Sequence, residues 1–358
     1  PSLRGGGAER VMVTLANTFA ERGLTVDLVL ASATGPYLAE ISPSVNVVDL
    51  GKTRTITGLP GLMKYLCKRR PAVILSAMRH ANLTALLAKC LARVKTRVVI
   101  SERNDAPSKA NQQNGIRSSF IQFLSRRLYV NADAVHAVSQ GVADSTSKHL
   151  GLPREKITVV YNPVVSENLL RQAQADDGCQ WGWDNSRPLI LAAGRFTKQK
   201  DFPTLIRSFA LLRKRCDALL VIMGDGELRP ELENLITDLD LQGHVLLPGF
   251  VENPFVVMKR ANVFVLSSAW EGLPNVLIQA MACGTPVVST NCPSGPAEIL
   301  EDGKWGRLVS VGDVEALAQA IFDTLAVKQH PDVAGRATYF SVERAADGYL
   351  RLLLPENH

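Results

Sequence analysis

The fold is decided by one stretch of the sequence, residues 263–290, which reads VFVLSSAWEGLPNVLIQAMACGTPVVST. Its apolar ends, residues 263–266 and 285–289, are short and rich in Val, which predicts two buried strands. Between them, Pro274 suits the first turn of a helix, and Gly284 suits the position after its last turn. Parallel strands need a crossover connection, which is usually a helix, so this stretch predicts an α/β fold.

The same alternation of strand and helix runs along the rest of the chain. Strands are predicted at residues 26–31, 72–76, 97–101 and 134–138, and again at 189–193, 218–223, 244–247, 263–266 and 285–289. The stretch between the two sets, residues 172–187, is polar and irregular. We therefore predict two Rossmann-like doubly wound domains facing a central cleft, residues 1–168 and 188–335. Residues 336–358 are expected to form a C-terminal helix that packs back on the first domain.

The composition is that of an ordinary globular protein. Of the 358 residues, 46% are hydrophobic and 21% are charged, which allows two domains with cores of their own. No run approaches the about 18 consecutive apolar residues of a membrane-spanning helix. The six cysteines show no metal-binding spacing, so we expect free thiols in a reducing compartment and no metal site.

A glycine loop, Gly5-Gly6-Gly7, follows the first four residues. Such loops normally follow a strand and open a helix, so we expect the first strand to be missing from this sequence. Glycines let the backbone approach a ligand closely, and free N–H groups at a helix start attract anions. The loop does not fit the dinucleotide-binding pattern, because Ala8 and Arg10 occupy its later positions. No cofactor is therefore expected.

Positive charge is concentrated in the first domain. Residues 51–130 contain sixteen Lys and Arg residues but only two acids, Glu102 and Asp105. A field of one sign indicates an anionic partner, which could be a membrane surface, a phosphorylated substrate or nucleic acid, although a solvated basic face is the simpler alternative. Residues 59–70 place Leu62 and Leu66 among basic residues and could form an interfacial helix.

Two loops that follow predicted strands of the second domain carry candidate ligand-binding groups. Gly194 and Arg195 follow the strand at 189–193, and Lys200 lies five residues beyond Arg195. Two cations at the carboxyl end of a strand could neutralise a diphosphate, Arg through a planar fork and Lys as a point charge. Gly224 follows the strand at 218–223 in a Gly-Asp-Gly turn, which could bring backbone beside a nucleotide. Surface cations and a simple turn are the plain alternatives.

The loop and helix after residues 263–266 carry more information. Glu271 lies in the loop, and Gln279 projects from within the predicted helix. The first-turn N–H groups of Asn275, Val276 and Leu277 are expected to be unpaired and suited to phosphate. A carboxylate for sugar hydroxyls beside a helix start rich in donors predicts a nucleotide-sugar site. An incidental Glu in a plain βαβ unit is the alternative.

Taken together, these motifs resemble glycosyltransferase family 4, a group of retaining enzymes with the GT-B fold. The resemblance covers nearly the whole chain. It rests on the Gly-Gly-x-Glu-like loop at Gly6 and Gly7, the Gly-Arg-x4-Lys segment, the Gly-Asp-Gly turn, the Glu-Gly-x-Pro-Asn-Val block with its Ala-Met-Ala-x-Gly-x-Pro-Val-Val continuation, and Ala297-Glu298-Ile299. Within the family, the chain looks like bacterial enzymes that extend lipid-linked oligosaccharides.

The resemblance implies a role for each matching residue of the donor site. Glu271 would bind hydroxyls of the donor sugar, and Arg195 and Lys200 would hold the donor diphosphate. The backbone around Gly224 and Phe250 would seat the base. Glu298 is a further substrate-binding candidate. The family has a second acid eight residues after Glu271, at the ribose, where this chain has Gln279, whose amide can still accept and donate a hydrogen bond.

The resemblance also implies the reaction and the partners. The first domain would carry a glycan or polyprenyl-diphosphate-linked acceptor, and the second a UDP- or GDP-sugar, from which a hexose or N-acetylhexosamine moves with retention and without a metal ion. His80 and Glu102 are acceptor-side candidates, since the family's usual histidine is absent after residues 97–101. The enzyme is expected in the cytoplasm, at the inner face of the membrane, as part of bacterial surface polysaccharide synthesis.

Two alternatives stay open. A sugar-nucleotide epimerase of the same fold would need acid–base side chains that the sequence does not place. A basic nucleic-acid-binding protein is indicated by charge alone, without a recognition motif or an aromatic-rich basic platform, so nucleic acid is not an expected partner.

Overall fold

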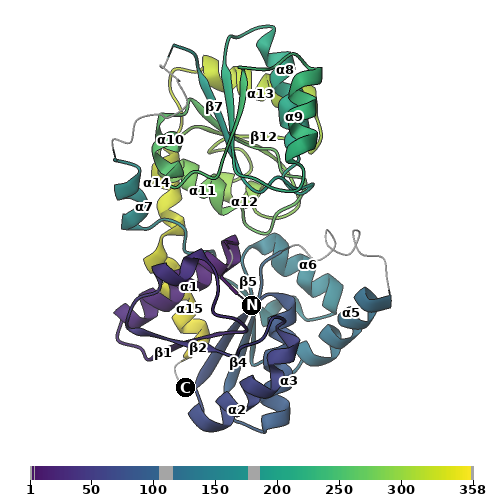
Figure 1. Cartoon of the computed structure of the whole chain (residues 1–358), viewed down its shortest axis with the longest axis vertical. Coiled ribbons are helices and arrows are strands. Elements are labelled where there is room, and N and C mark those ends of the chain that lie inside the picture. Colours follow the sequence, from purple (N-terminus) through teal and green to yellow (C-terminus); the bar gives the residue numbers. More distant parts are fainter. Residues whose placement is uncertain (1, 4, 105–115, 176–185, 356–358) are drawn as a thin grey trace. The chain divides into compact units, whose positions relative to one another are not determined.

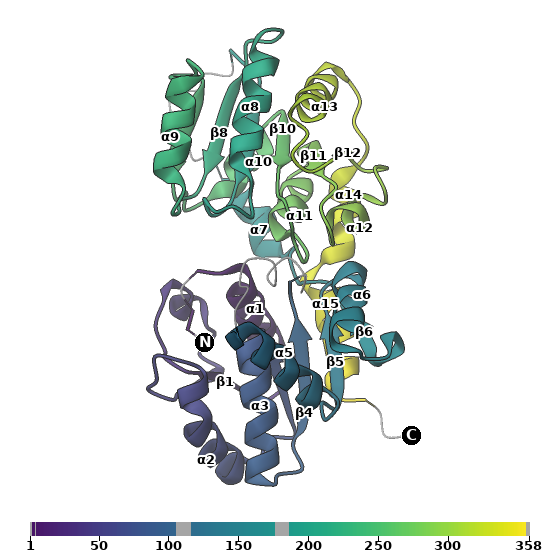
Figure 2. The same cartoon turned by 90° about the vertical axis from the view of Figure 1, so that its right-hand side faces the viewer.

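The structure, a computed structural model, describes residues 2–3, 5–104, 116–175 and 186–355. The chain forms two compact units, which Figures 1 and 2 show in views 90° apart. Unit 1 consists of Pro1–Pro163 together with Val342–His358, and unit 2 consists of Val164–Ser341. The chain therefore returns to unit 1 after unit 2 is complete.

Unit 2 is built on a six-stranded sheet in which every strand pair is parallel, with the order β12-β11-β10-β7-β8-β9. The strands are β7 (Leu189–Ala193), β8 (Leu219–Met223), β9 (Val245–Gly249), β10 (Val263–Leu266), β11 (Val287–Thr290) and β12 (Arg307–Val309). The predicted strand at 285–289 begins two residues later, after Pro286, which has no N–H to donate.

The helices of unit 2 lie on either side of its sheet. They are α7 (Glu167–Gln172), α8 (Phe202–Arg213), α9 (Arg229–Asp238), α10 (Pro254–Arg260), α11 (Asn275–Ala282), α12 (Pro296–Leu300), α13 (Val314–Ala326) and α14 (Val333–Ala337). Helices α8, α9 and α13 share one hydrophobic core with the strands, in which Phe209, Ile222 and Ile321 are buried. In Figure 1, α10 and α11 lie on the other side of β7 from α9.

Unit 1 contains two parallel sheets. One pairs β1 (Val26–Leu30) with β2 (Val45–Asp49). The other has the order β3-β4-β5-β6. Its strands are β3 (Val73–Ala77), β4 (Arg97–Glu102), β5 (Ala134–Ala137) and β6 (Ile157–Val159). The sequence did not predict β2 or β6, because β2 alternates with Asn46 and Asp49 and β6 has only three residues.

The helices of unit 1 are α1 (Gly7–Glu21), α2 (Leu59–Arg69), α3 (Arg79–Ala92), α5 (Ile116–Tyr129), α6 (Gln140–Leu150) and α15 (Val342–Leu353). Helix α15 lies beside α1 although more than 300 residues separate them, and its Tyr349 is completely buried in a core that also holds Val11 and Val99. Arg22 of α1 forms an ion pair of 2.5 Å with Asp347 of α15.

The apolar side chains of helix α2 differ in how deeply they are buried. Leu66 is completely buried, and Leu62 is half-buried and lines an internal cavity. Leu66 therefore packs within its own unit and does not face a membrane, whereas the interfacial helix itself stays a prediction. The exposed residues of α2 include Lys64, Cys67 and Lys68, and the two lysines would favour an anionic surface.

Candidate functional site

The candidate donor site lies at the carboxyl ends of three neighbouring strands in unit 2. Strand β7 pairs with β8 on one side and with β10 on the other. Because all three run parallel, the loops that follow them emerge at the same edge of the sheet. These loops carry Lys200, Gly224 and Glu271, and the pairing of β7 with β10 brings Lys200 and Glu271 together.

The loops after β7 and β8 pack backbone against backbone. Gly224 has φ +129°, and a Cβ at this position would lie 2.0 Å from the carbonyl oxygen of Gly194. The N–H of Gly194 donates to the carbonyl of Met223 at 2.9 Å, and the N–H of Gly224 donates to the carbonyl of Gly249 at 2.8 Å. Gly224 is therefore required both by its backbone conformation and by this close approach.

Lys200 and Glu271 form a buried ion pair at the centre of the candidate site. The Nζ of Lys200 lies 2.6 Å from Oε1 of Glu271, and the two side chains are 16% and 8% exposed. Glu271 also accepts hydrogen bonds from Oγ of Ser268 at 2.8 Å and from Nε2 of Gln199 at 3.2 Å. Three donors thus fix the carboxylate, as an ionised group removed from water requires.

Further hydrogen bonds hold the two loops together. Nε2 of Gln199 donates to the carbonyl of Trp270 at 3.0 Å, and the N–H of Ala269 donates to the carbonyl of Gln199 at 2.8 Å. Ser267 Oγ donates to the carbonyl of Lys200 at 2.7 Å. Sequence reasoning missed Gln199 and both serines, although polar residues at the end of a buried strand were a visible signal.

The aliphatic part of the Lys200 side chain passes over the backbone of Gly194. A Cβ at Gly194 would lie 3.0 Å from Cε of Lys200, so the glycine leaves room for the lysine stem on its way to Glu271. Cys292 is also buried beside this pair. Burial, with the Glu271 carboxylate adding to it, raises the pKa of the Cys292 thiol to about 12. This thiol therefore stays protonated and adds no charge to the site.

Two candidate residues at this edge are exposed. Arg195 is exposed, and no described residue forms a hydrogen bond or ion pair with its guanidinium group. Phe250, directly after β9, is 87% exposed. Leaving a large aromatic ring in water forgoes the free energy of burial, so Phe250 is suited to covering a flat ring.

Helix α11 begins at Asn275, next to Glu271 in the chain. Asn275, Val276 and Gln279 are half-buried. The N–H of Leu277 donates to the carbonyl of Pro274 at 3.0 Å. The expectation of an unpaired Leu277 N–H is therefore wrong, because the first turn closes on the residue before the helix. Glu298 lies in the first turn of α12, and its carbonyl accepts a hydrogen bond from Arg336 at 3.0 Å.

In unit 1, amides of the glycine loop donate hydrogen bonds to a carboxylate of the helix that follows the loop. Oε2 of Glu9 accepts hydrogen bonds from the N–H groups of Gly5 and Gly6 at 2.9 and 3.0 Å. The expectation that the amides of this loop are free for an anion is therefore wrong for Gly5 and Gly6, since a carboxylate already occupies them. Gly7 is exposed and is the first residue of α1.

The two acceptor-side candidates lie in different environments. His80 is exposed in the first turn of α3. Glu102, the last residue of β4, is 6% exposed. Its Oε1 accepts hydrogen bonds from the hydroxyl of Tyr129 at 2.5 Å and from Nδ2 of Asn82 at 3.2 Å. Glu102 therefore joins β4 to α3 and α5, whereas His80 faces solvent.

A buried polar network behind Glu102 was missed by sequence reasoning. The guanidinium of Arg103 donates to Oδ1 of Asn162 at 2.9 Å and to the hydroxyl of Tyr349 at 3.1 Å. His136 is completely buried, within 2.8 Å of Oγ of Ser101 and within 2.9 Å of the carbonyl of Val160. Burial, together with the Arg103 charge, lowers the pKa of His136 to about 3, so its ring is neutral near pH 7.

Comparison with known families follows the division into units. The profile described as "Glycosyltransferase Family 4" matches residues 5–168, and the profile described as "Glycosyl transferases group 1" matches residues 175–339. The chain belongs to glycosyltransferase family 4. It is a glycosyltransferase, and the resemblance drawn from its motifs is confirmed.

Two bacterial proteins illustrate what this glycosyltransferase is similar to. One is the N-acetylgalactosamine-N,N'-diacetylbacillosaminyl-diphospho-undecaprenol 4-alpha-N-acetylgalactosaminyltransferase of Campylobacter jejuni, 32% identical over 89% of this chain and 87% of the relative. The other is the lipopolysaccharide core biosynthesis glycosyltransferase LpsE of Rhizobium meliloti, 30% identical over 97% of this chain and 96% of the relative.

Among solved structures, HepE of Anabaena in complex with UDP has the same fold. Its TM-score is 0.77 at 20% identity, over 98% of this chain and 96% of HepE. The glycosyltransferase therefore has the GT-B fold, as predicted. In the part of the chain that the structure describes, no helix is both long and apolar enough to cross a bilayer. Among the same residues, no three His, Cys, Asp or Glu side chains gather as a metal site would require.

Proposed function

We propose that this glycosyltransferase moves a hexose or N-acetylhexosamine, with retention and without a metal ion, from a UDP- or GDP-sugar to a hydroxyl group of a lipid-linked or other glycan acceptor. The observation that carries the proposal is the buried Lys200–Glu271 pair at the carboxyl ends of β7 and β10. A carboxylate held by three donors in this position is ready to accept hydrogen bonds from sugar hydroxyls.

The cations of the β7 loop fit a diphosphate. Lys200 has three donors, of which one is directed at Glu271, so the others are available to phosphate oxygens. The Arg195 side chain is exposed and without a described partner, so a bidentate contact with phosphate would break no existing bond. Fixed cations beside a leaving group stabilise the negative charge that develops on it.

The base has a place at the neighbouring loops. The backbone at Gly224 and Gly249 is held by their mutual hydrogen bond of 2.8 Å. Phe250 lies at the end of β9 with its ring exposed. We propose that the base binds against this backbone and that Gln279, from α11, reaches the ribose. HepE, which shares the fold, binds UDP. This favours a UDP-sugar over a GDP-sugar as the donor.

The proposed reaction needs no protein nucleophile. The bond between the anomeric carbon and the leaving phosphate oxygen breaks, and its electron pair goes to that oxygen. The acceptor hydroxyl forms the new bond on the same face of the sugar and passes its proton to the departing phosphate. Glu271 would orient the sugar during this exchange, while Arg195 and Lys200 would stabilise the leaving diphosphate.

The acceptor is proposed to bind unit 1, as a glycan carried on a polyprenyl diphosphate. Support comes from the Campylobacter jejuni relative, whose name gives a diphospho-undecaprenol acceptor, and from the lipopolysaccharide function in the name of LpsE. The basic residues of 51–130 fit an anionic acceptor or an anionic membrane surface. We propose that the enzyme works at the cytoplasmic face of a bacterial membrane in surface polysaccharide synthesis.

The donor site can be tested by thermal shift with UDP- and GDP-sugars, comparing the wild type with Arg195→Ala. Arg195 is exposed and unpartnered, so its removal should leave the fold intact while weakening stabilisation by the donor about tenfold in apparent affinity. Lys198→Ala is the matched control, since it removes an exposed cation of the same loop. Equal loss of binding in both variants would point to a general charge effect and count against the proposed role of Arg195.

The reaction itself can be tested with an undecaprenyl-diphosphate-linked glycan and the donor found by thermal shift. We expect transfer in the presence of EDTA and a product whose anomeric configuration, read by NMR, is that of the donor. Inversion of configuration would refute retention. Loss of activity with EDTA would refute metal independence. Binding of RNA with no response to any nucleotide sugar would support the nucleic-acid alternative instead.

A further inference from the structure

Arg103 is a buried cation without an acid partner. The residue is 7% exposed, and among the described residues no other Lys or Arg is so deeply buried. No described Asp or Glu forms an ion pair with it. Its guanidinium donates instead to Oδ1 of Asn162 at 2.9 Å and to the hydroxyl of Tyr349 at 3.1 Å. The buried Lys200 of unit 2, by contrast, has the Glu271 carboxylate at 2.6 Å.

The groups around this guanidinium are neutral. Burial raises the pKa of the Tyr349 hydroxyl, which therefore keeps its proton. The His136 ring lies 4.7 Å from the Tyr349 ring, measured between centroids, and with a pKa of about 3 it is uncharged near pH 7. The remaining contact is Sδ of Met12, 3.8 Å from Nη2. An arginine does not lose its proton in a protein, so a full positive charge is buried here among dipoles alone.

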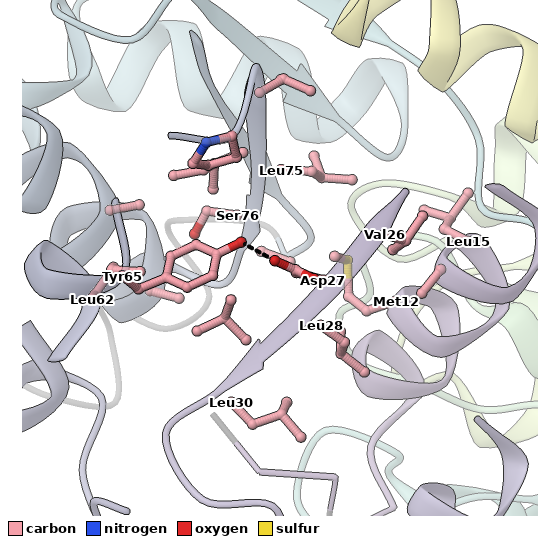
Figure 3. Close-up of a pocket in the computed structure, with 18 of the residues that line it drawn as sticks. Met12, Leu15, Val26, Asp27, Leu28, Leu30, Leu62, Tyr65, Leu75 and Ser76 are labelled. Carbon is pink, nitrogen blue, oxygen red and sulfur yellow. Dashed lines mark hydrogen bonds between the residues drawn. The ribbon is translucent and has the colours of Figure 1, made fainter. Parts of the chain in front are cut away.

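The cavity beside Met12 supplies no counter-charge. Met12 lines a cavity of about 770 Å³ in unit 1, which Figure 3 shows together with Asp27. The two described acids that line it are Glu9 and Asp27. Glu9 accepts hydrogen bonds from amides of the glycine loop, and Asp27 accepts one from the hydroxyl of Tyr65 at 2.7 Å. Both carboxylates are therefore already bound by donors of their own.

The guanidinium also has hydrogen-bond donors to spare. Of the five N–H groups of an arginine, two donate here to oxygen and one faces the sulfur of Met12. Nε of Arg103 is buried and has no hydrogen-bond partner among the described residues. A buried donor without a partner costs free energy, and in a native structure it calls for a bound water, ion or ligand. An oxyanion would supply both the missing acceptor and the missing charge.

The position of Arg103 is that of a ligand-binding residue. It is the first residue after β4, at the edge of a parallel sheet where ligands bind. Met78, the first residue after the neighbouring strand β3, has φ +79° and ψ 137°, which costs free energy in any residue except glycine. Two costly features thus follow two paired strands. Such features gather at functional sites, because stability alone would not select them.

We propose that Arg103 is a substrate-binding residue of unit 1 and that its guanidinium binds a phosphate group of the lipid-linked acceptor. This inference rests on the proposed function, in which unit 1 takes a glycan carried on a polyprenyl diphosphate. The phosphate would compensate the buried charge and accept the spare N–H groups, for which the planar fork of an arginine is suited. Asn162 and Tyr349 would hold the guanidinium in place, so α15, which carries Tyr349, would help to form the site.

The site can first be located in the wild-type chain, with farnesyl diphosphate as the probe. Amide hydrogen exchange is measured with farnesyl diphosphate and, separately, with UDP. We expect farnesyl diphosphate to slow exchange at residues 97–103, and UDP to slow it in the loops after β7 and β8 instead. Protection of residues 97–103 by UDP alone would assign Arg103 to the phosphate of the donor and overturn the proposal. Protection there by neither compound would overturn it as well.

Variants then test the residue itself. Arg103→Gln removes the charge, so the affinity for farnesyl diphosphate, measured by calorimetry, should fall by about tenfold or more. Arg103→Lys should restore part of it. Tyr349→Phe removes one partner of the guanidinium, and Lys148→Gln removes an exposed cation in the last turn of α6, so both should bind like the wild type. A loss in either control equal to that in Arg103→Gln would overturn the proposal, by showing a structural effect or a general charge effect.

Inorganic diphosphate separates the phosphate from the lipid chain. It should displace farnesyl diphosphate from the wild type, because the proposed contact is with phosphate. Displacement that fails at any concentration would mean that the lipid chain alone binds, and this would overturn the proposal. No sugar is transferred in these experiments, and UDP only marks the donor site. Failure at Arg103 with UDP still bound would therefore leave the proposed donor site standing, whereas a lack of UDP binding would count against that site and not against Arg103.

Discussion

Glu271 depends on Lys200 for its stability in the fold as well as for any role in catalysis. The pair is nearly buried, and each partner compensates the charge of the other. A loss of activity on removing Lys200 alone would therefore mix chemistry with unfolding. Arg195 has no such structural role, so the two cations of the same loop serve as different kinds of probe.

We predict that Lys200→Met lowers the free energy of unfolding of unit 2 by about 3–5 kcal/mol, because it leaves the Glu271 carboxylate buried without its cation. The double variant Lys200→Met with Glu271→Gln should recover part of this loss. Trp270 lies beside Glu271, so urea unfolding followed by tryptophan fluorescence reports this unit. Equal stability of the single variant and the wild type would show that the pair contributes nothing net.

A second prediction concerns pH and His136. Its pKa is about 3 in the folded chain and near 6.5 when unfolded, so between these values only the unfolded chain takes up the proton. The contribution of His136 is therefore fully present above pH 6.5 and is lost as the pH falls. Between pH 6.5 and pH 5 the loss should be about 2 kcal/mol. Hydrogen exchange at β5 measures it, and in His136→Gln the slope with pH should shrink.

At the scale of elements, the sequence predicts best where a strand is buried on both faces. Residues 189–193 and 263–266 were predicted with the boundaries that the structure has, since their apolar runs end sharply at Gly194 and Ser267. Strands β2, β6 and β12 were missed, because an edge strand or a three-residue strand has little apolar signal. Whether a strand can be predicted thus depends on whether it lies at the centre or at the edge of its sheet, and the sequence does not give that position.

The candidate site shows the same limit. Lys200 and Glu271 could be found from the sequence because each follows a predicted strand. Gln199 could not, since its contact with Glu271 depends on β7 lying next to β10. Ser268 lies three residues before Glu271 in the same loop, so its role had a local signal that the sequence analysis did not use. The Gly5 and Gly6 amides donate hydrogen bonds to Glu9, and the Leu277 amide donates one to the carbonyl of Pro274. These bonds could not be predicted, because they depend on local geometry that several side chains would allow.

A prediction at this scale concerns the contact between the loops after β7 and β8. Gly224→Ala places a Cβ 2.0 Å from the carbonyl oxygen of Gly194, so the loops must separate, and we expect donor affinity to fall by about tenfold or more. Gly243→Ala is the control, since it also has a positive φ, +74°, but no atom within 4 Å of its Cβ. It should cost only about 1 kcal/mol of stability and leave the donor affinity, measured by calorimetry, unchanged.

At the scale of the whole molecule, unit 2 is continuous in the sequence and unit 1 is not. We predict that residues 164–341 expressed alone fold and bind UDP or GDP, because the donor-site residues and their core all belong to this unit. Residues 1–341, which lack α15, should keep nucleotide binding but lose protection of α1 and β4 in hydrogen exchange. Failure of residues 164–341 to bind any nucleotide that the full chain binds would contradict this division.

Placing α15 in the core of unit 1 also sets the order in which the enzyme can mature. A ribosome that has made Pro163 must still synthesise all of unit 2 before α15 emerges, which takes roughly ten to forty seconds at about 5–20 residues per second. During that interval the surfaces of α1 and β4 that α15 covers are open to solvent or to chaperones. The unit that begins the chain is therefore completed last, and no nascent chain can have a finished unit 1 before its unit 2 is made.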